Sequence, residues 1–155
     1  MAKPIRRAQK MLDGNAPHQR TLSAKISHLF EMVRAEDGRK LTVKQAVALI
    51  REAGAEVSES HLSELRRGVK DNPTIRVLEA LAGVFQVPVA YLLRDEPDVV
   101  ALVDSRLELR EAMRQAKVSH ISHAPDAGMS PDQQIELNRF LTRLIREEVV
   151  KQARE

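Results

Sequence analysis

The sequence predicts an all-α fold, and three observations lead to that prediction. Apolar residues recur at the i, i+3, i+4, i+7 spacing of amphipathic helices along most of the chain. No segment alternates apolar and polar residues over enough positions to indicate a strand. Leu, Val, Ile and Ala supply nearly all of the apolar mass, with three Phe, one Tyr and no Trp. At 155 residues the chain is long enough for one domain or two small ones around a real hydrophobic core.

The basic residues are concentrated at the start of the chain. Residues 1–20 carry five Lys or Arg against one Asp and show little apolar periodicity, which predicts a basic disordered arm. The remainder is close to neutral within a total net charge of +3. The absence of cysteine excludes disulfides and fits a reducing cytoplasm. No apolar run approaches the ~20 residues that span a bilayer, so we expect a cytoplasmic protein without membrane association.

The first two helices are expected between residue 22 and residue 54. The first covers about 22–36, before Gly38, and its apolar face is formed by Ile26, Leu29, Phe30 and Val33. The second opens at Thr42, where Thr42 and Gln45 have the spacing of a capping box, and ends at Gly54.

Three shorter helices follow. The third is expected to run from Ser58, as N-cap, to Arg67, with Gly68 after its end. The fourth is expected to start at Asn72-Pro73, with Asn as cap and Pro as first helical residue. It carries the apolar residues Ile75, Leu78, Leu81, Ala82 and Phe85. After Val87-Pro88, a fifth helix over 89–93 should direct Leu92 and Leu93 to the core.

A domain boundary is predicted at Asp95-Glu96-Pro97, which divides a domain over 21–95 from a C-terminal one over 96–155. The second domain should contain two helices, one over about 97–116 and one that opens with Ser130-Pro131-Asp132-Gln133. The last helix carries a long apolar stripe. Because two helices alone leave such faces exposed, we expect this stripe to form a homodimer through Leu137, Leu141, Leu144 and Ile145.

The segment Ser58–Gly68, S-E-S-H-L-S-E-L-R-R-G, carries the strongest functional signal. Its outward face is small, polar and basic, which suits a helix that lies in a DNA major groove. Its rear face would pack on the scaffold through two leucines. The side chains that could reach base edges are Ser60, His61 and Glu64.

Residues around this helix are candidates for contact with the DNA backbone. They are polar or basic and cluster near helix ends, where phosphates are commonly bound; they are Lys44, Ser58, Ser63, Arg66, Arg67, Lys70 and Asn72. Arg66 has an alternative role in an internal salt bridge, with Glu52 or Glu79 as partner. Arg67 and Lys70 are also compatible with ordinary solvated charges.

The pattern S-x-x-x-L-S-x-L-R-x-G, followed by N-P-T and L-x-x-L-A-x-x-F-x-V-P-x-x-Y-L-L, resembles the Cro/CI-type (XRE) helix-turn-helix family over about residues 22–94. The second helix and the turn before V-S-E-S-H-L-S-E-L-R-R-G are longer than the tight link usual in that family. This longer form looks like the actinobacterial EspR-like nucleoid-associated regulators. The resemblance implies a five-helix lambda-repressor-like domain that binds double-stranded DNA. It also implies transcription regulation, location at the nucleoid and a C-terminal dimerisation domain.

Other functions find little support in the sequence. No nucleophile elbow, glycine-rich phosphate loop or H-E-x-x-H string occurs, so we expect no enzyme and no cofactor. His120 and His123, with Asp126 nearby, are a weak metal signal, and no metal is expected. One alternative stays open, a protein-interaction adaptor such as an antitoxin or anti-regulator. The near-neutral charge of 21–97 and the acidic Glu59 and Glu64 favour it.

Overall fold

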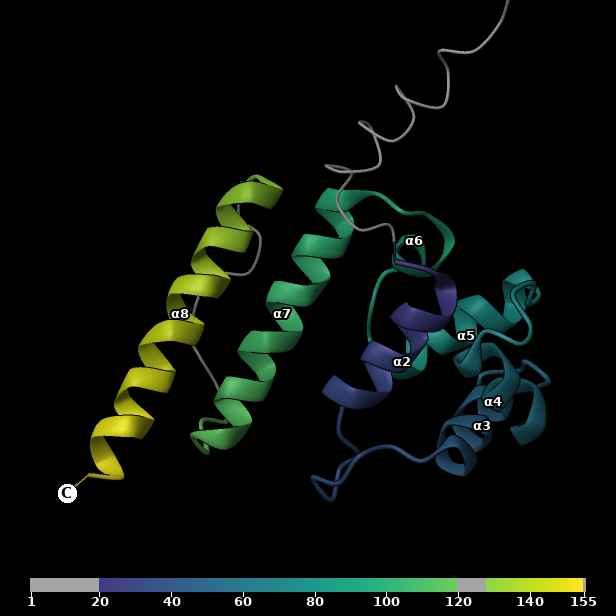
Figure 1. Cartoon of the computed structure of the whole chain (residues 1–155), viewed down its shortest axis with the longest axis horizontal. Helices are drawn as coiled ribbons and strands as arrows, with labels where there is room; N and C mark the ends of the chain where they lie inside the picture. Colours follow the sequence, from purple (N-terminus) through teal and green to yellow (C-terminus); the bar gives the residue numbers. More distant parts are fainter. Residues whose placement is uncertain (1–19, 120–127, 155) are drawn as a thin grey trace, which may run out of the picture.

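The computed structural model describes residues 20–119 and 128–154, and over these residues the protein is all-helical (Figure 1). The all-α prediction is therefore confirmed, with helices that fit a helix-turn-helix domain followed by C-terminal helices. The described segments contain no strand beyond a single isolated bridge between Arg34 and Lys40. The helices are α2 (Leu22–Met32), α3 (Val43–Glu52), α4 (Glu59–Arg67), α5 (Ile75–Phe85), α6 (Val89–Leu93), α7 (Pro97–Gln115) and α8 (Pro131–Gln152).

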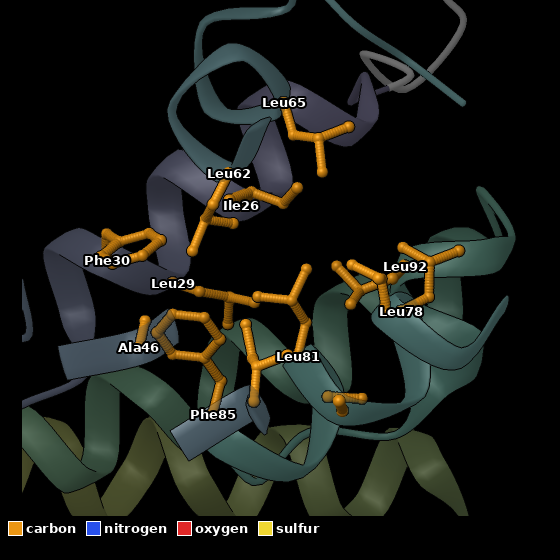
Figure 2. Packing of buried hydrophobic residues seen from close by; sticks show 14 of the residues in the cluster. Ile26, Leu29, Phe30, Ala46, Leu62, Leu65, Leu78, Leu81, Phe85 and Leu92 are labelled. Atoms are coloured by element: carbon orange, nitrogen blue, oxygen red, sulfur yellow. The ribbon is translucent and has the colours of Figure 1, made fainter. Parts of the chain in front are cut away.

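The hydrophobic core lies among α2–α6. Figure 2 shows Leu62 and Leu65 of α4 directed toward Ile26 of α2, while Leu81 and Phe85 enter from α5. The Phe30 and Phe85 rings meet edge to face with centroids 5.0 Å apart. Such an arrangement adds about 1 kcal/mol to the burial of the two rings. The core thus joins α2, α4 and α5 into one rigid support.

Side-chain caps begin three helices at the predicted residues. The Thr42 hydroxyl accepts a hydrogen bond from the Gln45 N–H, and the Gln45 side-chain oxygen accepts one from the Thr42 N–H, which completes the capping box. Ser58 caps α4, and Ser130 caps α8 with a second capping box. These starts depend on residues only three positions apart, which explains why they could be read from the sequence.

The start of α5 differs from the prediction. Thr74, not Asn72, is the N-cap, because its hydroxyl accepts a hydrogen bond from the Val77 N–H at 3.3 Å. The helix consequently begins at Ile75, whose side chain is 64% exposed and does not enter the core. Leu93 also differs, since it is the last residue of α6 and remains 48% exposed, whereas Leu92 is buried as expected.

Helix α2 ends four residues before the predicted boundary. Val33 is extended, although its N–H still reaches the Leu29 carbonyl. The chain then turns back, and the Ala35 N–H donates to the Arg39 carbonyl. Gly38, with φ of +79°, serves this tight turn rather than a helix terminus.

Helices α7 and α8 lie side by side and run in the same direction (Figure 1). Side-chain hydrogen bonds join the two helices: Asn138 donates to the Ser105 hydroxyl (3.0 Å), and Arg106 donates to the side-chain oxygen of Gln134 (2.9 Å). On its other side, α7 contributes Val103 and Leu107 to the core shared with α2–α6. Helix α7 therefore connects the core to α8.

Ion pairs and a hydrogen bond also join α2 and the residue Arg20 before it to α7 and to the α6–α7 junction. Arg20 lies 2.8 Å from the Asp104 carboxylate of α7. His28 Nε2 approaches that carboxylate to 3.2 Å without hydrogen-bond geometry. Lys25, only 2% exposed, donates to the Arg94 carbonyl at 2.8 Å and lies 3.4 Å from Asp95. A buried lysine requires such partners, and here they lie at the α6–α7 junction.

Candidate nucleic-acid interface

Helix α4 is held by its rear face. Leu62 and Leu65 are completely buried, while Glu59, Ser60 and Arg67 are exposed. The Ser27 hydroxyl of α2 donates to the Arg66 carbonyl at 3.1 Å, which fixes the end of the helix. The division between a leucine side and a polar side is the one predicted, and it leaves the polar side open to a partner.

The N-terminus of α4 is presented by the turn that follows α3. Ala55 and Val57 in this turn are buried, so the turn is anchored in the core. Ser58 accepts a hydrogen bond from the His61 N–H at 3.0 Å. Two of the predicted base-facing residues, Ser60 and His61, lie in the first turn of the helix, which is the part that meets base edges in helix-turn-helix complexes. Ser60 is exposed and His61 is half-buried.

Glu64, the third predicted base-facing residue, has an internal partner. Its carboxylate lies 3.1 Å from the ammonium of Lys70 in the loop after α4. Lys70, predicted to contact the DNA backbone, is the group that neutralises this carboxylate. The pair reduces the repulsion that Glu64 would exert on phosphates, and it also takes Lys70 out of the set of unpaired cations.

Arg66 is directed toward α2. Its guanidinium lies 4.7 Å from the centre of the Phe30 ring and 3.7 Å from the Glu31 carboxylate. The partner is thus Glu31, and neither Glu52 nor Glu79 forms the salt bridge. Lys40 donates a hydrogen bond to Glu31, and this contact, with Arg66 and Arg34 adding to it, lowers the pKa of the Glu31 carboxyl. Arg66 therefore packs as a structural side chain at the edge of the candidate interface.

The other predicted backbone contacts are accessible. Lys44 in the first turn of α3 and Asn72 in the loop after α4 are both exposed. Arg67 is exposed as well, and its Nε–H donates to the Ser63 carbonyl at 3.4 Å, while Ser63 itself is half-buried. With Ser58 these residues surround the polar side of α4, and Lys44 and Arg67 have no carboxylate partner within the described segments.

The structure adds Arg51, which was not among the predicted site residues. Arg51 and Ser58 line an open groove of about 620 Å³ over the turn between α3 and α4, together with Gly54, Ala55, Glu56 and Val57. In the sequence Arg51 appears only as a basic residue near the end of a helix, a common position on account of the helix dipole. Its proximity to Ser58 depends on how the turn folds, and no short sequence motif predicts that proximity.

The predicted dimerisation residues of α8 are not fully covered by the rest of the described chain. Leu137, Leu141 and Ile145 are half-buried, and Leu144 is 45% exposed. Phe140, which the prediction omitted, is 57% exposed and stands one turn before Leu144. The face toward α7 is more polar, since its buried residues are Ile135, Asn138 and Thr142. We define the apolar stripe of α8 as Leu137, Phe140, Leu141 and Leu144; the half-buried Ile145 lies nearer to the side that packs on α7.

His120, His123 and Asp126 lie outside the described residues, as does most of the basic arm. Within 20–119 and 128–154, no helix is long and apolar enough to cross a membrane.

The chain is similar to a mycobacterial nucleoid protein. It is 29% identical over 120 residues to the nucleoid-associated protein EspR of Mycobacterium tuberculosis strain ATCC 25618 / H37Rv. The same identity and length apply to EspR of strain CDC 1551 / Oshkosh. The alignment covers 77% of this chain and 89% of each relative. No family model matches the chain.

Proposed function

We propose that this protein is a DNA-binding transcription regulator of the nucleoid, in the cytoplasm, which acts as a homodimer and inserts α4 into the major groove. One observation carries the proposal. Helix α4 is fixed by two completely buried leucines, while its capped first turn leaves Ser60 exposed and His61 half-buried on the polar side. The similarity to a nucleoid-associated protein supports DNA as the partner. The role is one of binding, without catalysis.

In this proposal, Ser60 and His61 contact base edges, and Glu64 helps to set the surrounding charge through Lys70. Lys44, Ser58, Arg67 and Asn72 contact phosphates, assisted by Arg51. Arg66 contributes mainly by holding α4 on α2. Assignment to the XRE class rests on the spacing of the motifs in α4 and α5, in which Leu62 and Leu65 occupy the buried positions.

Titration against duplex DNA tests the proposal. We expect the full chain to bind selected genomic fragments more tightly than random sequence, with affinity that decreases steeply with salt. His61→Ala should reduce the preference about tenfold, because a base contact contributes ~1–3 kcal/mol of discrimination. Arg67→Gln should weaken all fragments alike and lower the salt slope by about one phosphate equivalent. Arg94→Gln, an exposed change at the end of α6, is the matched control. Equal binding of all sequences by the unaltered protein would contradict the proposal.

The homodimer is tested separately through the apolar stripe on α8. Phe140→Ser combined with Leu144→Ser removes two exposed side chains, so the change should weaken self-association without unfolding the monomer. Sedimentation equilibrium should show a dimer for the original protein and a monomer for the variant. Leu93→Ser, at a similarly exposed leucine outside α8, should leave the dimer intact. A dimer that survives the double change would place the interface elsewhere.

A protein-interaction adaptor is the second candidate. Two basic residues in or just after α4 favour it, because Arg66 and Lys70 are each paired with a carboxylate of this chain. This candidate predicts a protein partner that covers His61 and no shift of any DNA fragment. The same titration therefore separates the two functions.

A further inference from the structure

We propose that α8 carries a second DNA-contacting surface, an arginine stripe formed by Arg139, Arg143 and Arg146, which binds the duplex backbone without sequence preference. The proposal rests on the proposed DNA-binding function and adds a site remote from α4. Figure 1 shows α8 on the far side of α7 from α3 and α4. A duplex held by the stripe is thus engaged by a different surface of the protein from the one that presents Ser60 and His61.

The spacing of the arginine stripe places all three side chains on one side of α8. Positions i, i+4 and i+7 of an α-helix share a face, and they span ~10 Å along its axis at ~1.5 Å per residue. Duplex DNA carries one phosphate per ~1.7 Å of its axis, so a row of this length can meet several phosphates at once. Guanidinium groups also match phosphate oxygens in a two-pronged geometry.

The stripe is exposed and forms no internal ion pair within the described segments. Arg139, Arg143 and Arg146 are all exposed, and none makes an ion pair or hydrogen bond with any residue in the described part of the chain. Arg20, Arg34, Arg66, Arg94 and Arg114, by contrast, all have carboxylate partners. Unpaired arginines in a row are available to an external anion.

The three arginines line an open groove of about 600 Å³ along α7 and α8. Thr142, Val150 and Lys151 also line it, and Lys151 pairs with Glu148. Glu108 and Glu147 also line it, so the groove has four cationic and two anionic side chains and a net positive charge. A polyanion that follows the arginine row is the occupant whose charge this surface complements.

The arginine stripe is compatible with the proposed homodimer. On a helical projection at 100° per residue, the arginines lie between the face packed on α7 and the apolar stripe of Leu137, Phe140, Leu141 and Leu144. Dimerisation through the apolar stripe therefore leaves the arginines on its flank. A dimer would carry two α4 helices and two arginine stripes, and could hold separate segments of one DNA molecule.

The test replaces the stripe in the full chain by Arg139→Gln, Arg143→Gln and Arg146→Gln together. The control removes three other exposed positive charges through Arg94→Gln, Arg114→Gln and Lys117→Gln. Binding to random and to preferred duplexes is measured at several salt concentrations. If each arginine neutralises one phosphate, the slope of log affinity against log salt should decrease by about 2.7, at roughly 0.9 per phosphate. The control should change it far less, and sequence preference should persist.

Each outcome bears separately on the two proposals. An unchanged slope in a protein that still prefers certain fragments overturns the stripe and leaves the proposed function standing. Binding that depends on the stripe but shows no sequence preference supports the stripe and contradicts the role of α4. Absence of DNA binding by the unaltered protein overturns both. Should the triple variant lose helicity by circular dichroism, Arg143→Gln alone and the triple replacement by Lys answer the same question. The first should reduce the slope by about 0.9, and the second should retain most of it.

Discussion

The position of Gly68, which ends α4, favours glycine for two separate reasons. Its φ is +75°, and a Cβ placed there would lie 3.1 Å from the Ser23 hydroxyl oxygen of α2. The first demand is conformational, since the left-handed region costs other residues about 1–2 kcal/mol. The second is steric and arises from the packing of α4 on α2. The end of the candidate recognition helix is thereby tied to the core.

Gly68→Ala separates these demands when compared with Gly38→Ala. Gly38 has φ of +79° but open space around its Cβ position. We expect Gly38→Ala to lower the free energy of unfolding by about 1 kcal/mol, the conformational cost alone. Gly68→Ala should lose more, because Ser23 must also move. Urea unfolding measures both values, and equal losses would show that the contact with Ser23 is accommodated freely.

Tyr91 gives a pH-dependent prediction at the same scale. Its ring is fully buried, and its hydroxyl makes no hydrogen bond of ordinary geometry among the described residues, although the Arg20 guanidinium is close enough to interact with it. Burial, with the nearby Asp104 charge, raises the pKa of the Tyr91 hydroxyl to about 12, although the Arg20 guanidinium opposes the shift. The folded state thus favours the neutral phenol. The resulting contribution to stability is complete below pH ~10, the pKa of an unfolded tyrosine, and is lost as the pH rises toward 12.

Tyr91→Phe should consequently be neutral or slightly stabilising at pH 7, because it removes a buried hydroxyl that has no well-formed hydrogen bond. Between pH 10 and 12 the original protein should lose stability faster than the variant. Chemical unfolding at a series of pH values gives the difference between the two proteins. A variant that is destabilised at pH 7 would indicate that the hydroxyl does have a favourable contact.

At the scale of helices, caps formed by residues close in sequence could be predicted, whereas contacts between residues distant in sequence could not. The starts at Thr42, Ser58 and Ser130 follow from caps within three residues. The predicted cap of α5, Asn72, is wrong because Thr74 is an equally good capping residue type and the tertiary path of the loop favours it. The salt bridge of Arg66 could not be assigned, since Glu31 is 35 positions away and becomes a neighbour only when α4 packs on α2.

Thr74→Ala tests which residue starts α5. We expect it to lower the free energy of unfolding by about 1 kcal/mol, the usual cost of losing a capping hydroxyl. Asn72→Ala should leave stability nearly unchanged, because Asn72 is exposed and lies outside the helix. Thermal and urea unfolding of the two variants provide the comparison. The opposite ranking would restore Asn72 as the cap.

For the whole molecule, the important question is how rigidly α4 is held relative to α8. Helix α4 packs on α2, α2 is linked to α7 through Arg20, His28 and Asp104, and α7 packs along α8. If α8 forms the dimer interface, this chain of contacts sets the separation of the two α4 helices. The separation in turn fixes the spacing of the two half-sites on DNA, about 10 base pairs per helical turn.

Asp104→Ala should loosen this connection. Asp104 is 19% exposed, and its loss leaves Arg20 and His28 without their shared anion. We expect a moderate loss of stability, about 1 kcal/mol, since solvent still reaches the pair.

The Asp104→Ala variant should also change how DNA affinity depends on half-site spacing. The original protein should prefer one half-site spacing, whereas the variant should bind fragments with 5 inserted base pairs almost as well. Asp37→Ala, at an exposed pair with Arg39, is the control and should keep the original preference. If Asp104→Ala shows the same spacing preference as the original protein, the hydrophobic contacts of Val103 and Leu107 are sufficient to fix α7 on the core.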